Sequence, residues 1–139
     1  TAGCGLGGVT AFAVVDAGSA VTVDYVNAGG RHLGGYILPG LQMMRRSLKV
    51  DAARIGFEQS EQLDTRPGQS TGECVNHGLA WLTEALVQGI HRDAKAFGLS
   101  AIYLTGGDAR RLQALGLEAN LVEGMVLDGL ERIASAGVL

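Results

Sequence analysis

The sequence predicts one α/β domain, residues 1–139, in which a mixed sheet carries helices on both faces. Two observations predict this architecture. Strand-like patterns fill the chain up to residue 38, and from there helical periodicity alternates with short apolar runs. The composition, 47% hydrophobic and 18% charged, is that of a globular chain long enough to bury a substantial core.

Three consecutive antiparallel strands are expected first. Residues 11–16 form a continuous apolar run, as in a strand buried on both faces. Residues 20–26 alternate apolar and polar side chains, the pattern of a half-buried strand. A turn signal at residues 27–30 leads into a third extended run at residues 31–38.

The pattern then becomes helical. Pro39 suits the first turn of a helix, and apolar residues follow it at helical spacing. Three basic residues fall on the opposite side of this helix: Arg45, Arg46 and Lys49. They predict a solvated face, with anion binding as the alternative. Residues 56–68 are polar and aperiodic, which predicts an exposed loop of the kind that is often mobile.

A long helix is expected over residues 70–97, where Ser70 and Glu73 fit a capping box. It carries two adjacent apolar stripes: Val75, Leu79, Leu82, Leu86 and Ile90 in one, and Cys74, Gly78, Trp81 and Ala85 in the other. A helix this apolar around its girth needs two packing partners. We expect the sheet to be one partner and a second copy of the chain to be the other, giving a homodimer.

The remaining elements alternate. Residues 100–105 predict a buried strand, residues 106–115 turn into a helix, residues 117–122 predict a last strand, and residues 126–135 close as an amphipathic helix. The formal net charge of −3 gives no sign of direct nucleic-acid contact, and no apolar run is long enough to span a membrane. Cys4 and Cys74 are too few for a disulfide framework and predict free thiols in the cytoplasm. The chain does not begin with Met, so we expect it to be part of a longer protein.

Several familiar motifs fail on inspection. Residues 3–8 match G-x-G-x-x-G by letter but precede a strand instead of following one, so they are no dinucleotide fingerprint. No P-loop or G-x-S-x-G is present. The three histidines, His32, His77 and His91, lack metal-ligand spacing.

Two stretches remain as candidates for a phosphate or nucleotide site. At Asp16–Ala20 a buried strand emerges into a turn where Gly18 bares the backbone and Ser19 offers a hydroxyl. A carboxylate beside phosphate would repel it, so Asp16 implies a cation between them. An ordinary hairpin turn also explains these residues. At residues 104–109, LTGGDA, a strand ends in paired glycines, and Asp108 either caps the next helix or adjoins a ligand.

With these residues in view, the chain resembles a known family, the type III pantothenate kinases, which are homologous to the Bvg accessory factor proteins. Five stretches carry the resemblance, in family order: VVDAGSAVTVDYV, GGRHLGGYILPGLQMMRRSL, PGQSTGECVNHG, IYLTGGDA and MVLDGL. The resemblance implies an actin-like fold, as in Hsp70 and sugar kinases, built from two ribonuclease-H-like halves with ATP between them. This chain is similar to the second, C-terminal half only.

The resemblance also implies roles for individual residues. Asp16 matches a ligand of the activating monovalent cation, K⁺ or ammonium, and Gly18 and Ser19 match the ATP-phosphate turn, where the family usually has Thr in place of Ser19. Gly106 and Gly107 match the loop near the nucleotide base, and Mg²⁺ accompanies ATP. Thr71 matches a residue that touches pantothenate across the dimer interface, although its place in a capped helix start would also explain it.

The implied function is phosphorylation of pantothenate by ATP, the first committed step of coenzyme A synthesis. The family's Asp-x-Gly-Asn and Gly-x-Asp-Arg motifs, the second of which holds the catalytic aspartate, are not among these residues. We therefore expect them in an upstream half, name no catalytic residue here, and expect this chain alone to be inactive. The alternative is a regulatory protein of the Bvg accessory type that acts by binding without catalysis.

Overall fold

The computed structural model describes residues 10–51 and 55–124. A five-stranded mixed sheet forms the centre, with strand order β3-β2-β1-β4-β5. The strands are β1 (Phe12–Ala17), β2 (Ala20–Val26), β3 (His32–Pro39), β4 (Ala101–Thr105) and β5 (Asn120–Leu121). The first three are antiparallel neighbours, whereas β4 runs parallel to both β1 and β5. The predicted α/β class is confirmed.

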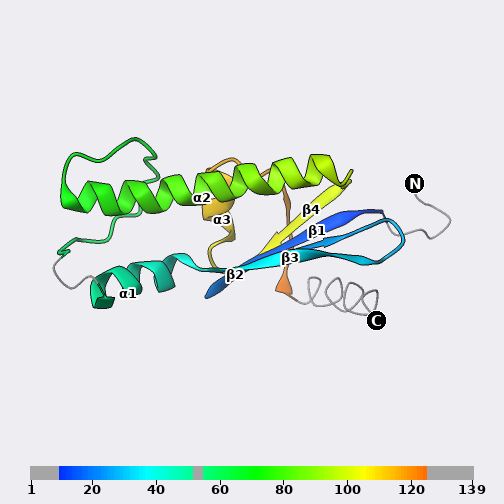
Figure 1. Cartoon of the computed structure of the whole chain (residues 1–139), viewed down its shortest axis with the longest axis horizontal. Helices are drawn as coiled ribbons and strands as arrows, with labels where there is room; N and C mark the ends of the chain where they lie inside the picture. The colour runs from blue at the N-terminus through cyan, green and yellow to red at the C-terminus, as the bar shows by residue number, and fades with distance from the viewer. Residues whose placement is uncertain (1–9, 52–54, 125–139) are drawn as a thin grey trace.

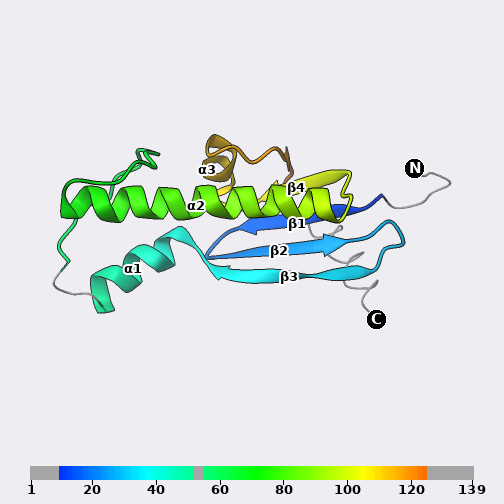
Figure 2. The same cartoon turned by 45° about the horizontal axis from the view of Figure 1, so that its top comes forward.

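Three helices complete the described part: α1 (Leu41–Asp51), α2 (Thr71–Ala96) and α3 (Ala109–Ala114). Figures 1 and 2 show α2 lying along one side of the sheet. The helix extends beyond the end of the sheet where strand β1 ends. The expectation of helices on both faces of the sheet depends on the helix predicted over residues 126–135. That segment lies outside the described residues.

The core lies between the sheet and the two helices α2 and α3. Alternate residues of β1 and β2 face this side, and they pack with the buried side chains of α2, β4 and α3: Val15, Val23, Tyr25, Val87, Ile90, Leu104 and Leu112 among them. The period-two pattern of residues 20–26 therefore predicts correctly which face of β2 is buried. On the opposite face, Phe12, Val14 and Val26 form a smaller cluster.

α2 is rotated from the predicted orientation. Its buried residues are Leu79, Ala80, Thr83, Val87 and Ile90, whereas Leu82 of the first predicted stripe is 46% exposed. Thr83 can lie inside because its hydroxyl donates to the carbonyl of Leu79 and accepts from Arg111. The second predicted stripe, Cys74, Gly78, Trp81 and Ala85, is exposed throughout, and Trp81 is 60% exposed.

Two expectations about α1 are wrong. Pro39 is the last residue of β3, and the helix begins at Leu41, with Gly40 between them. Arg45 does not lie on a solvated face: only 4% of it is exposed, because its guanidinium turns inward to Ser60 and Glu61. Arg46 and Lys49 are exposed, as predicted.

Among the described residues, no helix has both the length and the apolar character that crossing a membrane requires.

Candidate functional site

The turn between β1 and β2 is a tight hairpin. The Gly18 amide donates to the carbonyl of Ala20 at 3.1 Å, and Ser19 lies exposed at the tip. Asp16 is half-buried on β1, and its Oδ1 would lie 3.4 Å from a Cβ added to Gly18, an ordinary contact. Residues other than glycine could also adopt the backbone conformation of Gly18, because its φ is not in the left-handed region. The fold itself therefore does not require glycine at this position.

The second candidate loop packs directly on the end of β1. Gly106 has φ +103° and lies so close to Ala17 that an added Cβ would come within 2.5 Å of its carbonyl carbon and oxygen. The Asp108 amide donates to the Ala17 carbonyl at 2.9 Å. Both the conformation and the space at residue 106 thus require glycine. At Gly107 a Cβ would meet nothing within 4 Å.

Asp108 does not act as the predicted side-chain cap. It occupies the N-cap position of α3 but makes no capping hydrogen bond. Its carboxylate lies 3.7 Å from Arg111 instead, and Arg111 donates to Thr83 Oγ1 at 2.7 Å. Burial raises the pKa of Asp108, although the charge of Arg111 opposes this, and burial lowers the pKa of Arg111.

The sheet brings the two loops together. β1 and β4 are parallel neighbours, with Asp16 in register with Thr105, so their carboxyl ends meet at one edge. Gly40 closes the same corner from a third side: its amide donates to the Ser19 carbonyl at 3.0 Å, and an added Cβ would overlap that oxygen. Asp16, Gly18, Ser19, Gly106 and Gly107 are thus gathered at one edge. Carboxyl edges of this kind are where open α/β sheets bind ligands.

Thr71 lies elsewhere. It is the exposed first residue of α2, directly after the N-cap Ser70, whose Oγ accepts from the Glu73 amide at 3.2 Å. Figure 1 shows the start of α2 well beyond the end of the sheet. Thr71 lines a cavity with residues of α1 and of the segment before α2, and no residue of the two loops lines it. Within one chain, Thr71 is therefore not part of the site at the sheet edge.

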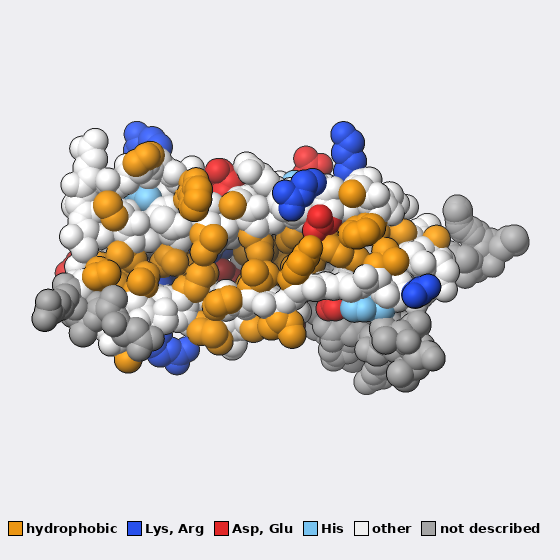
Figure 3. Space-filling view, viewed as in Figure 1, with side chains coloured by type: hydrophobic (Ala, Val, Ile, Leu, Met, Phe, Trp, Pro, Cys, Tyr) orange, Lys and Arg blue, Asp and Glu red, His pale blue; other side chains and the backbone are white. Residues whose placement is uncertain are grey.

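Sequence reasoning missed Gly40, Thr83 and Arg111, and it placed Arg45 on a solvated face although this residue is buried. The spacing of Asp108 and Arg111, three residues apart in a helix, could have indicated their pairing. No local pattern indicates that α1 and α2 border a mostly apolar cavity of about 360 Å³, lined by Leu41, Met44, Leu82, Ala85 and Leu86 with Asp108 and Arg111 beside them. Figure 3 shows hydrophobic side chains gathered along the seam between the two helices.

The strand order 3-2-1-4-5, with a hairpin turn and a glycine loop at the carboxyl edge of the parallel pair, is consistent with a domain of actin-like fold. The sequence comparisons give the family. A family model described as type III pantothenate kinase matches residues 7–93, and the chain belongs to this family.

Individual relatives agree with this membership. A type III pantothenate kinase of Marinobacter nauticus is 98% identical over 128 residues, covering 92% of this chain and 53% of that protein. One of Chromohalobacter salexigens is 41% identical over 123 residues, covering 84% and 44%. A crystal structure titled as a conserved putative Baf family transcriptional activator, from Campylobacter jejuni, matches with TM-score 0.61 and 27% identity, covering 92% and 59%. The chain spans about half the length of the curated relatives it matches.

Proposed function

We propose that this chain is the C-terminal half of a kinase that transfers a phosphoryl group from ATP to pantothenate, the first step of coenzyme A synthesis. The observation that carries the proposal is the convergence of the Asp16–Ala20 turn and the Gly106–Gly107 loop at one sheet edge, in a chain of the pantothenate kinase family. Phosphoryl transfer depends on positioning and charge neutralisation, which bare backbone amides, hydroxyls and cations provide.

In this proposal Gly18 and Ser19 contact the phosphates of ATP, which binds with Mg²⁺. Gly18 supports the assignment because the fold does not require a glycine there, whereas close approach of a phosphate does. Gly106 and Gly107 border the nucleotide base. Gly106 holds the loop on β1, and Gly107 leaves open space in front of it.

Asp16 would hold a monovalent cation, K⁺ or ammonium. A half-buried carboxylate beside the phosphate turn fits this role, because without a cation it would repel ATP. The described residues contain no group of three His, Cys, Asp or Glu side chains that could hold a metal ion. The other oxygen ligands would therefore be backbone carbonyls, water, phosphate or the rest of the protein.

The proposal also includes a homodimer in which each copy contributes to pantothenate binding by the other. Thr71 would touch pantothenate bound to a second copy, since it lies apart from the site of its own chain. The homodimer would form through the helix at residues 70–97. Its exposed stripe, with Trp81 and the small residues Gly78 and Ala85, and the apolar seam beside α1 offer a surface for a second copy.

No residue of this chain is assigned as the catalytic base, which we place in the upstream half together with the first phosphate loop. The chain alone would therefore be inactive. A purely regulatory role of the Bvg accessory type is less favoured, because the curated relatives are named as kinases. A sequence pI near 5.5 also argues against direct nucleic-acid contact. The free, exposed Cys74 suits the cytoplasm.

The test is a titration of kinase activity against K⁺ in the full-length enzyme. Asp16→Asn should raise the K⁺ concentration required for half-maximal activity. Ser19→Ala should instead weaken ATP use by the loss of one hydrogen bond to a charged group, about 1.5–3 kcal/mol, with an unchanged K⁺ curve. A wild-type K⁺ curve for Asp16→Asn would refute the cation role and return the turn to a plain hairpin.

A further inference from the structure

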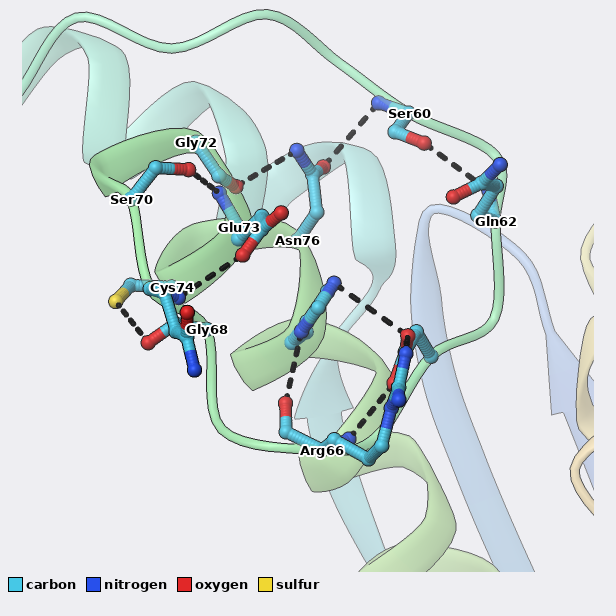
Figure 4. A network of polar contacts seen from close by, with 12 residues as sticks. Ser60, Gln62, Arg66, Gly68, Ser70, Gly72, Glu73, Cys74 and Asn76 are labelled. Atoms are coloured by element: carbon cyan, nitrogen blue, oxygen red, sulfur yellow. Dashed lines mark hydrogen bonds and ion pairs between the residues drawn. The ribbon is translucent and has the colours of Figure 1, made fainter.

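The segment before α2 is fastened to both α1 and α2 at one residue, Ser60. Residues 58–69, here called the strap, are polar and mostly exposed. At Ser60 the carbonyl accepts from Arg45 Nη2 of α1 at 3.0 Å, while the amide donates to Asn76 Oδ1 of α2 at 3.2 Å. Arg45, Ser60 and Asn76 are called the clamp below. Figure 4 shows the α2 side of it.

Asn76 connects the strap to the first turn of α2. Its Nδ2 donates to the Glu58 carbonyl and to the Gly72 carbonyl, both at 2.9 Å. With the bond from Ser60, one side chain fixes two points of the strap and the residue next to Thr71. The strap and the start of the helix are thus bound to the same side chain.

The other end of the strap is fastened as well. The Gln69 amide donates to Glu73 Oε1 at 2.9 Å, and Gly68 lies so close to the backbone of Glu73 and Cys74 that an added Cβ would overlap them. His77 Nδ1 lies 2.8 Å from the Arg66 carbonyl. The exposure predicted for this loop is found, and these contacts connect it to α2. Thr71 lies two residues beyond this fixed end, after the N-cap Ser70.

Stability alone is a poor explanation for the clamp. Arg45 is 4% exposed, and its charge is paired at 3.3 Å with Glu61, whose side chain is 75% exposed. Burying a guanidinium is costly, and replacing such a group by an apolar one is often neutral or stabilising. The strap that it holds buries little apolar surface. What the clamp does achieve is a defined position for the residues that lead into Thr71.

We propose that Asn76 and Arg45 are positioning residues for phosphoryl transfer: the clamp sets the strap and so places the Thr71 side chain against pantothenate bound to the partner copy. This inference rests on the proposed function and deepens it. Neither residue contacts substrate in this scheme; both act through Thr71.

The test uses steady-state kinetics of the full-length enzyme with Asn76→Ala, Thr71→Ala and the double variant. Asn76→Ala should raise the KM for pantothenate about tenfold, with the KM for ATP within about twofold of wild type. In the Thr71→Ala background the same change should add less than about twofold, because residues that act through one another are not additive. Arg66→Ala is the matched control, since its side chain is in the strap and 83% exposed, and among the residues that the structure describes it pairs with Asp64 alone.

Two further variants keep the test decisive. Asn76→Asp retains the acceptor for Ser60 and loses both donors, so it serves if Asn76→Ala does not fold, as judged by circular dichroism. Arg45→Met should raise the KM for pantothenate, and Arg45→Lys, which keeps one charged donor, should restore part of it. Equal increases in both KM values, or multiplicative effects in the double variant, would overturn the proposal. If Thr71→Ala leaves the KM for pantothenate unchanged, the assignment of Thr71 is refuted, and the clamp proposal with it. If Thr71→Ala raises this KM but Asn76→Ala does not, the clamp proposal alone is refuted.

Discussion

Replacing Gly106 by Ala should separate the Gly106–Gly107 loop from the end of β1. At φ +103° a residue with a Cβ is strained by about 1–2 kcal/mol. The added Cβ would lie 2.5 Å from the carbonyl carbon and oxygen of Ala17 and 2.8 Å from its nitrogen, where ordinary contact begins at 3.4 Å. The loop must therefore move by about an ångström, which breaks the bond from the Asp108 amide to Ala17, worth about 1 kcal/mol. Together these effects should lower the free energy of unfolding by about 3 kcal/mol.

The matched control is Gly107→Ala. Its φ is not left-handed and an added Cβ meets nothing within 4 Å, so its stability should stay within about 0.5 kcal/mol of wild type. Urea unfolding of the full-length protein, followed by circular dichroism, measures both variants. Kinase assays should in addition show a raised KM for ATP in Gly106→Ala. Equal unfolding curves for the two variants would refute the close packing of this loop on β1.

Three shorter predictions follow from other contacts. Gly40→Ala should raise the KM for ATP at least about tenfold, because its Cβ would push the carbonyls of Ser19 and Gly18 away. Gly56→Ala, with open space around it, should leave this KM unchanged. Burial raises the pKa of Asp108 above the ordinary 3.8, so between the unfolded and the folded pKa the folded chain retains a proton that the unfolded chain releases. The contribution of this group to stability therefore falls as pH rises from the unfolded pKa through the folded pKa. Asp108→Asn should remove that part of the pH dependence in urea unfolding. Trp81→Asp should shift the protein from dimer to monomer in sedimentation, since the exposed indole lies on the proposed interface, and an unchanged dimer would place the interface elsewhere.

Features that depend on neighbouring residues were predictable from the sequence. Residues 20–26 are β2 with the expected face buried, and the helix expected over residues 70–97 is observed as Thr71–Ala96. The capping box holds at Ser70, although the Glu73 carboxylate accepts from Gln69 instead of from Ser70 itself. Alternation, caps and turn residues act within a few positions, so a linear pattern contains them.

What the sequence did not predict depends on distant partners. The local pattern around Arg45 predicts a surface cation. In the structure Arg45 instead donates hydrogen bonds to Ser60 and Glu61, which belong to a later segment that packs against α1. In the observed orientation of α2, Thr83 accepts a hydrogen bond from Arg111, and Asp108 pairs with the same arginine instead of capping its helix. At the site, the paired glycines were found from sequence, but only the structure separates Gly106, which the fold requires, from Gly107, which it does not.

The distance between Thr71 and the turn at Asp16 has a genetic consequence. If each site of the dimer takes Asp16 from one copy and Thr71 from the other, two inactive alleles can complement each other. A mixed dimer of an Asp16 variant with a Thr71 variant contains one doubly damaged site and one intact site. With random pairing half of the dimers are mixed, so cells that carry both alleles should regain about a quarter of the wild-type active sites. Alleles that both alter residues at the sheet edge, such as Asp16 and Gly106, should show no such recovery.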